Sequence, residues 1–262
     1  MTKLNEYITQ KIQQKKILLM THTVAGSLDK KCQTNLVRAM ADSGADLIEL
    51  QFPFSDPIAD GPVITIENQK ALDRGTTTAG CFDLAQRLRE KTGLPLLVMT
   101  YFNIIYRFGP EKFINRAWES GIDGLIVPDI PPDQDNFGYF DCLKQKQLEP
   151  VQVFGLNTRE DRIHYLAHYT KSMFYLPLRI GITGEKESLP AEAKKKILQL
   201  KKITGARAAC GFGISRREHI DELAGYADIA VLGSRLISLY NSASAPKAGI
   251  AVVSDFLASL RK

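Results

Sequence analysis

The chain has 262 residues, of which 44% are hydrophobic and 24% charged, and its formal net charge is +5. This composition is ordinary for a globular protein. The positive charge is mild for the length, and no known motif accompanies the densest basic cluster at 194–202, so we expect no nucleic-acid partner. No apolar run reaches transmembrane length and the N-terminus is polar, so we expect neither a membrane span nor a signal peptide.

The cysteines point to a reducing compartment. The four of them lie far apart and show no CxxC spacing: Cys32, Cys81, Cys142 and Cys210. This argues against a zinc site and against a disulfide framework. The pattern fits reduced thiols, so we expect a cytoplasmic protein.

Strand-like and helix-like segments alternate along the whole chain. Leu4, Ile8 and Ile12 lie at helical spacing and predict an amphipathic N-terminal helix that caps the fold. Short apolar runs then predict strands over 17–21, 46–50, 94–101, 123–127, 150–154, 173–176, 206–211 and 228–232. Helical patterns follow at 31–42, 80–91, 111–120, 135–146, 159–169, 191–202, 216–224 and 234–240, with a terminal helix near 246–260.

This succession of strand and helix is typical of a (β/α)₈ TIM barrel, which needs about 250 residues. No linker interrupts the chain, so we expect residues 1–262 to form a single domain. A doubly wound open sheet is the alternative. The number of units and the lack of an early G-x-G-x-x-G motif speak against it.

Two carboxylates stand out between 46 and 65. Glu49 interrupts a short apolar strand, where an unpaired buried charge is costly. Asp60 lies in the turn-rich loop that follows. Two acids, one at a strand end and one in the next loop, suit acid–base chemistry. The structural alternatives are an ion pair for Glu49 and a simple Asp-Gly turn for Asp60.

Glycine-rich segments after the last two strands suggest a phosphate site. Residues 211–215 read GFGIS, and Gly233-Ser234 opens the helix predicted over 234–240. Glycines let the backbone approach an anion, and N–H groups at a helix start point toward it. Barrel phosphate sites are often built from these two loops. The alternative is that the glycines only permit tight turns.

Several segments of the chain resemble, in order, the signature segments of the tryptophan synthase alpha subunit family. They read ELQFPFSDPIADGPVI, MTYFN, VPDIPP, RIGITG, GFGIS and LGSRLI, and the similarity runs nearly end to end. The PFSDP…ADGP segment is highly specific. GFGIS and the closing Gly-Ser are shared with other phosphate-binding barrels.

The resemblance implies a lyase that cleaves indole-3-glycerol phosphate to indole and glyceraldehyde 3-phosphate, with no metal and no cofactor in this subunit. It implies that Glu49 is the general acid/base that protonates indole C3. Asp60 would hydrogen-bond the indole N–H and stabilise the positive charge that develops on the ring.

The resemblance also implies the remaining site residues. Thr183 would close the loop after strand six and help to orient Asp60. His22 stands where the family usually has an apolar or aromatic residue, and it could be either a core histidine or part of the pocket. The implied substrate-binding residues are Tyr175, Thr183, Gly184, Phe212, Gly213, Gly233, Ser234, Tyr101, Met99 and His22.

A beta subunit that carries pyridoxal phosphate and receives indole is the implied partner, in an alpha2-beta2 tetramer. The segments expected to face it contain Pro53, Phe54, Asp56, Asn103, Pro131 and Pro132.

Several positions depart from the family pattern. Gln51 replaces a usual glycine beyond Glu49, residues 26–28 read Gly-Ser-Leu, and Pro177-Leu178 precedes Arg179. Two alternatives therefore stay open: a free-standing indole-3-glycerol phosphate lyase, and a weakly active subunit that mainly activates a beta partner. An aldolase that forms a Schiff base is disfavoured, because no lysine lies at a predicted strand end.

Overall fold

The computed structural model describes residues 2–178, 188–211 and 213–261, and its eight parallel strands close into one barrel in the order β1 to β8. Thr183, Gly184 and Phe212, which the sequence places in the substrate site, lie outside these residues. The strands are β1 (Leu18–Val24), β2 (Leu47–Gln51), β3 (Leu96–Met99), β4 (Gly124–Ile126), β5 (Glu149–Val153), β6 (Met173–Pro177), β7 (Arg207–Gly211) and β8 (Ile229–Leu232). The predicted TIM barrel is confirmed.

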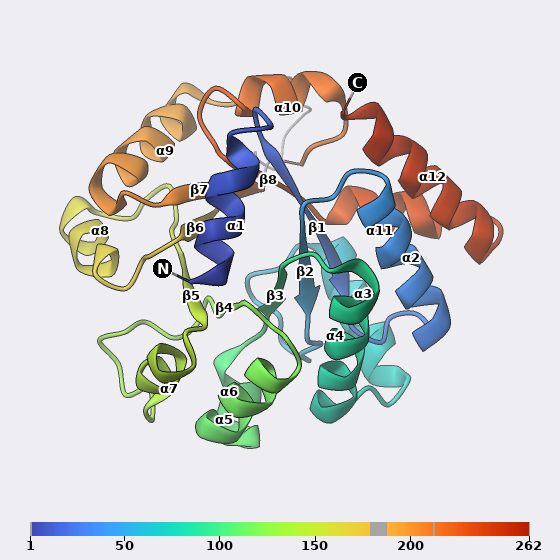
Figure 1. The fold of residues 1–262 in the computed structure, drawn as a ribbon, viewed down its shortest axis with the longest axis horizontal. Coiled ribbons are helices and arrows are strands. Elements are labelled where there is room, and N and C mark those ends of the chain that lie inside the picture. Colours follow the sequence, from blue (N-terminus) through green and yellow to red (C-terminus); the bar gives the residue numbers. More distant parts are fainter. Residues whose placement is uncertain (1, 179–187, 212, 262) are drawn as a thin grey trace.

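Helices surround the strands on all sides in Figure 1, and α1 crosses in front of them. The helices are α1 (Lys3–Ile12), α2 (Lys30–Asp42), α3 (Pro62–Asp73), α4 (Thr78–Thr92), α5 (Phe102–Phe108), α6 (Pro110–Glu119), α7 (Tyr139–Lys146), α8 (Glu160–Ala167), α9 (Ala191–Thr204), α10 (Arg217–Leu223), α11 (Ser234–Asn241) and α12 (Pro246–Ser259).

Two of these helices, α3 and α5, were not predicted from the sequence, and their residues were expected to form loops. Helix α3 starts at Pro62, a residue favoured in the first helical turn, but its buried positions include the polar Glu67 and Asn68, so its hydrophobic pattern is weak. Helix α5 has seven residues and follows β3 after two residues. A helix this short shows too few turns for its period to be recognised.

Residues on each strand alternate between the barrel interior and the helices. One buried cluster contains Leu18 and Met20 from β1, Leu47 from β2, and Leu97 and Met99 from β3. The intervening residues belong to two other clusters that include side chains of the surrounding helices. Strand geometry sends neighbouring side chains to opposite faces, so the interior series on each strand continues two residues at a time.

The N-terminal helix closes the end of the barrel at which the strands begin. Leu4 and Ile8 on α1 belong to the same buried cluster as Leu18, Met20 and Leu47. The predicted capping role of this helix is confirmed. The residues expected to react lie at the opposite end, where the strands finish.

A buried aspartate fastens both ends of the chain to this closed face. Asp46 is 2% exposed, accepts a hydrogen bond from the Leu19 N–H at 2.9 Å, and forms ion pairs with Lys15 and Arg261. The Tyr7 hydroxyl donates to the Asp46 carbonyl at 3.0 Å. The carboxylate thus links the segment after α1, β1 and the segment after α12, and the Asp46 carbonyl binds α1.

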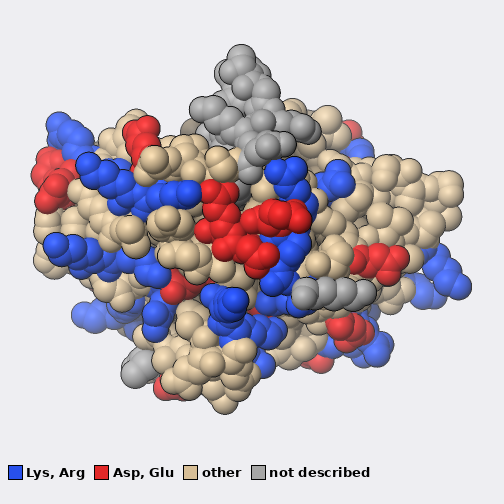
Figure 2. All heavy atoms as spheres, turned by 90° about the horizontal axis from the view of Figure 1, so that it is seen from above, with Lys and Arg blue, Asp and Glu red and all other residues tan. Residues whose placement is uncertain are grey.

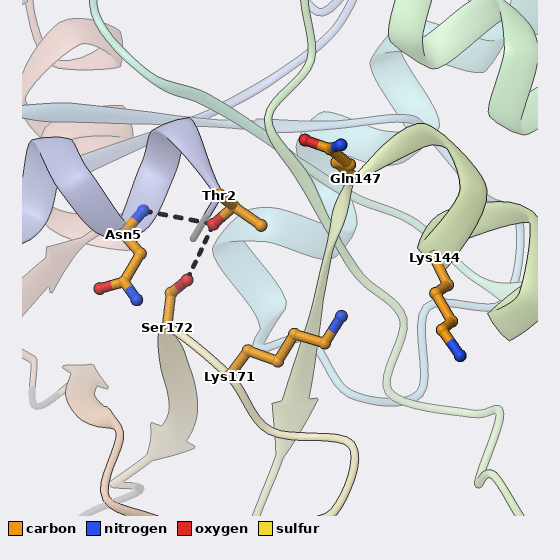
Figure 3. A pocket seen from close by; sticks show the side chains of 6 residues that line it. All are labelled: Thr2, Asn5, Lys144, Gln147, Lys171 and Ser172. Carbon is orange, nitrogen blue, oxygen red and sulfur yellow. Dashed lines mark hydrogen bonds between the residues drawn. The ribbon is translucent and has the colours of Figure 1, made fainter.

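A pocket of about 270 Å³ also lies at this end, lined by Thr2, Asn5, Lys144, Gln147, Lys171 and Ser172. Figure 3 shows Thr2 Oγ1 between the backbone nitrogen of Asn5 and the hydroxyl of Ser172, at 3.3 and 3.1 Å. Gln147 and Ser172 come just before β5 and β6, so this pocket is at the opposite end of the barrel from the residues expected to react.

Charges of both signs lie side by side on the face drawn in Figure 2. A mixed surface of this kind provides no extended basic field for a polyanion. Among the described residues, no helix is long and apolar enough to span a membrane.

Replacing Asp46 with alanine tests the importance of this anchor. Asp46→Ala leaves the buried Leu19 N–H and two cations without their partner, so we expect the free energy of unfolding to fall by about 3 kcal/mol. Chemical denaturation measures this. Asp42→Ala is the control, because its pair with Arg38 is exposed and spans 3.8 Å. Equal stability of the two variants would contradict the anchoring role.

Candidate active site

The candidate site lies at the barrel end where the strands finish. His22 on β1 and Glu49 on β2 stand opposite each other in the parallel register. They continue the interior series of Leu18, Met20 and Leu47. The strand alternation therefore directs both side chains into the mouth of the barrel.

Glu49 is buried and has a histidine partner. The Glu49 and His22 residues are 2% and 4% exposed, and Glu49 Oε1 lies 3.1 Å from His22 Nδ1. Burial lowers the pKa of His22, but the charge and hydrogen bond of Glu49, with a contribution from Asp60, outweigh burial and raise it above its usual value. Glu49 Oε2 and His22 Nε2 are buried and have no hydrogen-bond partner among the described residues. Each of these two atoms therefore keeps unused hydrogen-bonding capacity.

Asp60 is held by two donors that reach the same oxygen. Gln51 Nε2 lies 2.6 Å and Tyr101 Oη 3.0 Å from Asp60 Oδ2. The Tyr101 oxygen accepts from the Ala59 N–H at 3.0 Å, which orients its proton toward Asp60. Burial raises the pKa of Asp60, while the bonds from Gln51 and Tyr101 and the charge of His22 oppose that rise.

Helix α3 supports Gln51 and the loop that carries Asp60. Asn68 Oδ1 accepts a hydrogen bond from the Phe54 N–H at 2.9 Å and lies 3.4 Å from Gln51 Nε2. Its amide nitrogen donates to the Ile64 carbonyl at 2.9 Å, within α3. The loop that carries Asp60 is thereby tied to a helix at one side and to β2 at the other.

Gln51 and Asn68 were not among the predicted site residues. Gln51 follows Glu49 by two positions on the same strand, so strand alternation alone would have placed it on the same face. The sequence did not indicate a similar position for Asn68, because the helix that carries it, α3, was not predicted.

Tyr175 and Met99 lie on other strands of the barrel. Met99 ends β3 and is 6% exposed. Burial first, and then the charges of Glu49 and Asp60, raise the pKa of Tyr175 well above its usual value. The Tyr175 hydroxyl lies near Gly211 at the end of β7, where an added Cβ would be 3.7 Å away. Tyr175 therefore stays neutral beside the acid pair.

Two of the glycines predicted to bind phosphate, Gly213 and Gly233, come just after β7 and β8. Gly213 has a φ of +64°, a conformation that favours glycine. Gly233 is the N-terminal cap of α11, and a Cβ there would lie 3.5 Å from the Cβ of His22. Ser234, the first residue of α11, is exposed. The start of α11 is thus adjacent to the His22–Glu49 pair.

The residues predicted to face a partner differ in exposure. Phe54 stacks on Tyr101 with ring centroids 5.1 Å apart. Pro131 is half-buried. Asp56 and Asn103 are exposed, whereas Pro53 and Pro132 are buried in the isolated chain. Among the described residues, no group of three or more histidines, cysteines or acids is placed to hold a metal ion.

Comparison with known proteins identifies the family. The sequence pattern of the tryptophan synthase alpha chain family matches residues 8–259. The chain belongs to the tryptophan synthase alpha chain family. The alpha chain of Desulfotalea psychrophila is 39% identical over 98% of this chain and 99% of its own length. The alpha chain of Desulforapulum autotrophicum is 37% identical over 98% and 99%.

Solved structures agree with this assignment. A tryptophan synthase a2b2 complex from Pyrococcus furiosus contains a chain that is 31% identical, with a TM-score of 0.85 over 93% of this chain and 97% of that one. An Aquifex aeolicus structure is 29% identical, with a TM-score of 0.88 over 100% and 98%. The resemblance to tryptophan synthase alpha chains is therefore confirmed.

Replacing Gln51 tests its bond to Asp60. Gln51→Leu keeps a similar volume and removes a donor to the carboxylate, so we expect the pKa of Asp60 to rise further. Tyr101→Phe removes the second donor and should act in the same direction. Carboxyl NMR titration measures both shifts. Met99→Leu is the control, and a pKa of Asp60 that is the same in all three variants would contradict the assigned bonds.

Proposed function

We propose that this alpha chain cleaves indole-3-glycerol phosphate to indole and glyceraldehyde 3-phosphate, the alpha reaction of tryptophan synthase. The observation that carries the proposal is the meeting of two acids in different environments at the open end of the barrel. Glu49 is buried beside a histidine, and Asp60 accepts two hydrogen bonds. A carbon acid–base step and a developing positive ring charge need such a pair.

In the proposed reaction Glu49 gives its proton to indole C3. Asp60 accepts a hydrogen bond from the indole N–H and stabilises the positive charge that the ring acquires. The hydroxyl proton of the side chain then returns to Glu49 as the carbon–carbon bond breaks. The bond electrons restore the neutral indole ring, the hydroxyl becomes the aldehyde of the second product, and Glu49 regains its starting form.

Residues around the acids would hold the substrate. We propose that Tyr101, Met99, Tyr175 and His22 contact the indole end, because they lie on or directly after β1, β3 and β6. Gly213, Gly233 and Ser234 would bind the phosphate at the start of α11, with Thr183, Gly184 and Phe212 as further residues implied by the family resemblance. Free N–H groups and the helix dipole favour an anion at such a position.

We further propose a tryptophan synthase beta subunit as the partner, with pyridoxal phosphate in that subunit and none in this chain. The Pyrococcus furiosus relative is described as an a2b2 complex, which supports the same assembly here. The proposed contact surface is formed by the loops that carry Pro53, Phe54, Asp56, Asn103, Pro131 and Pro132. A cytoplasmic location is proposed from the four free cysteines.

Removal of either acid should abolish indole release. We expect Glu49→Gln to lower kcat by about 10³-fold, because the amide has no proton to give. Asp60→Asn should lower it by about 10²-fold, because the ring charge loses its counterion. Indole release from indole-3-glycerol phosphate measures both. The control is Glu90→Gln on the exposed surface of α4, which should behave like the unmodified chain.

The same assay with and without a beta subunit separates the remaining possibilities. Release that is slow alone and faster with the partner supports the proposed alpha chain. Fast release without a partner would indicate a free-standing lyase. No release in either condition, with the beta subunit still activated, would indicate a chain that only activates its partner.

A charge at the start of α11 tests the phosphate site. Ser234→Asp places a carboxylate where the phosphate would bind, so we expect KM to rise at least about tenfold through repulsion and a blocked N-terminus. Steady-state kinetics measures the change. Ser242→Asp makes the same substitution at the C-terminal cap of α11 and should leave KM unchanged. Equal KM values for the two variants would exclude this phosphate position.

A further inference from the structure

The reaction proposed above uses Glu49 alone and gives no role to the contact between Glu49 and His22. The two residues pair across β1 and β2, and their facing atoms are 3.1 Å apart. Each residue is more than nine-tenths buried, and each has a second polar atom without a hydrogen-bond partner in the described part of the chain. The geometry is that of one donor–acceptor bond with an open position on either side.

We propose that His22 is a positioning residue that shares one exchangeable proton with Glu49 and fixes the orientation of its carboxyl group toward the substrate. The inference rests on the proposed reaction, since it assigns His22 a role in the proton transfer of Glu49. In this role His22 orients Glu49, in addition to lining the pocket.

The charges around His22 favour this sharing. Glu49 faces it from β2, and Asp60 acts on it from the loop after β2. On the side of β8 the neighbour is Gly233, where an added Cβ would lie close to Ile64 of α3 as well as to His22, and neither Gly233 nor Ile64 carries a charge. Tyr175 on β6 stays neutral, because burial and the two acids raise its pKa.

Because both side chains are buried, a pair with no net charge is more stable than an isolated charge on either residue. An isolated carboxylate or imidazolium is costly in a dry pocket. With one exchangeable proton, the pair is either an ion pair or two neutral groups, and both forms have no net charge. The raised pKa of His22 agrees with a proton that is retained by this contact.

The proton count stays balanced through the reaction. In the neutral form of the pair that reacts, Glu49 carries its proton on Oε2 and accepts a hydrogen bond from His22 Nδ1–H at Oε1. Glu49 gives the Oε2 proton to indole C3, and the carboxylate that results keeps the hydrogen bond from Nδ1–H. This leaves Oε2 to face the substrate. The hydroxyl proton returns to Glu49 as the carbon–carbon bond breaks. His22 gains and loses no proton over the complete cycle, so its contribution is orientation and the stabilisation of both forms of Glu49.

Direct NMR titration tests the shared proton without an activity measurement. The chain has four histidines, so the ring signal of His22 can be assigned by comparison with His22→Asn. We expect His22 to keep its proton to a higher pH than His164, which is 62% exposed. We expect Glu49→Gln to remove or reverse this difference, because burial then lowers the pKa of His22 without the opposing charge of Glu49. If His22 titrates like His164 in the unmodified chain, the proposal is wrong.

The pH profile of indole release tests the effect on the reaction. In His22→Asn the amide nitrogen can still donate to Glu49, but it cannot bind the exchangeable proton. We therefore expect the alkaline limb of kcat/KM to move to lower pH. His22→Phe keeps an aromatic ring and loses the donor, so kcat should fall by on the order of tenfold or more. His164→Asn is the matched control and should change neither quantity.

The outcomes separate the two proposals. A drop in activity with an unmoved alkaline limb in His22→Asn would reduce His22 to a structural residue and overturn the inference. If the unmodified chain releases no indole at all, the proposed function fails, and the NMR titration still decides whether His22 and Glu49 share a proton.

Discussion

The closure of eight parallel strands determines where the reactive side chains of this protein can lie. In a closed barrel every second residue of a strand points into a filled interior, and only the residues beyond the last packed layer meet an open space. Leu18 and Met20 fill the interior below His22, and Leu47 does so below Glu49. Helix α1 covers the other end with Leu4 and Ile8, so the polar groups lie at the end where the strands finish.

The same constraint explains why the two acids differ. Glu49 belongs to a strand, so the barrel fixes its backbone and buries its side chain. Asp60 belongs to a loop and is only half-buried, and side chains from β2 and from the second residue after β3 hold it in place. An acid fixed by its strand and an acid held by hydrogen bonds from two neighbours divide the two tasks of the proposed reaction: proton transfer to carbon and stabilisation of charge on the ring.

Strand order and the position of Glu49 could be predicted from the sequence, because short apolar runs and the glycine-rich segments after them are local patterns. Contacts across strands could not. That His22 touches Glu49 depends on the register of β1 against β2, and hydrophobic period does not report register. Helix α3 was missed because its inward face carries Glu67 and Asn68, and the support that Asn68 gives to the Asp60 loop was missed with it.

The two departures from the family pattern on β1 and β2 have a common physical consequence. His22, which the resemblance leads us to expect at a usually apolar or aromatic position, contacts Glu49, and Gln51, expected at a usual glycine position, donates to Asp60. Each acid therefore has a hydrogen-bonding partner on a strand. Two nearby carboxylates raise each other's affinity for protons, and the charge of Glu49 does contribute to the raised pKa of Asp60. The hydrogen bond from Gln51 and the charge of His22 oppose this rise, so both residues lower the pKa of Asp60 relative to burial alone.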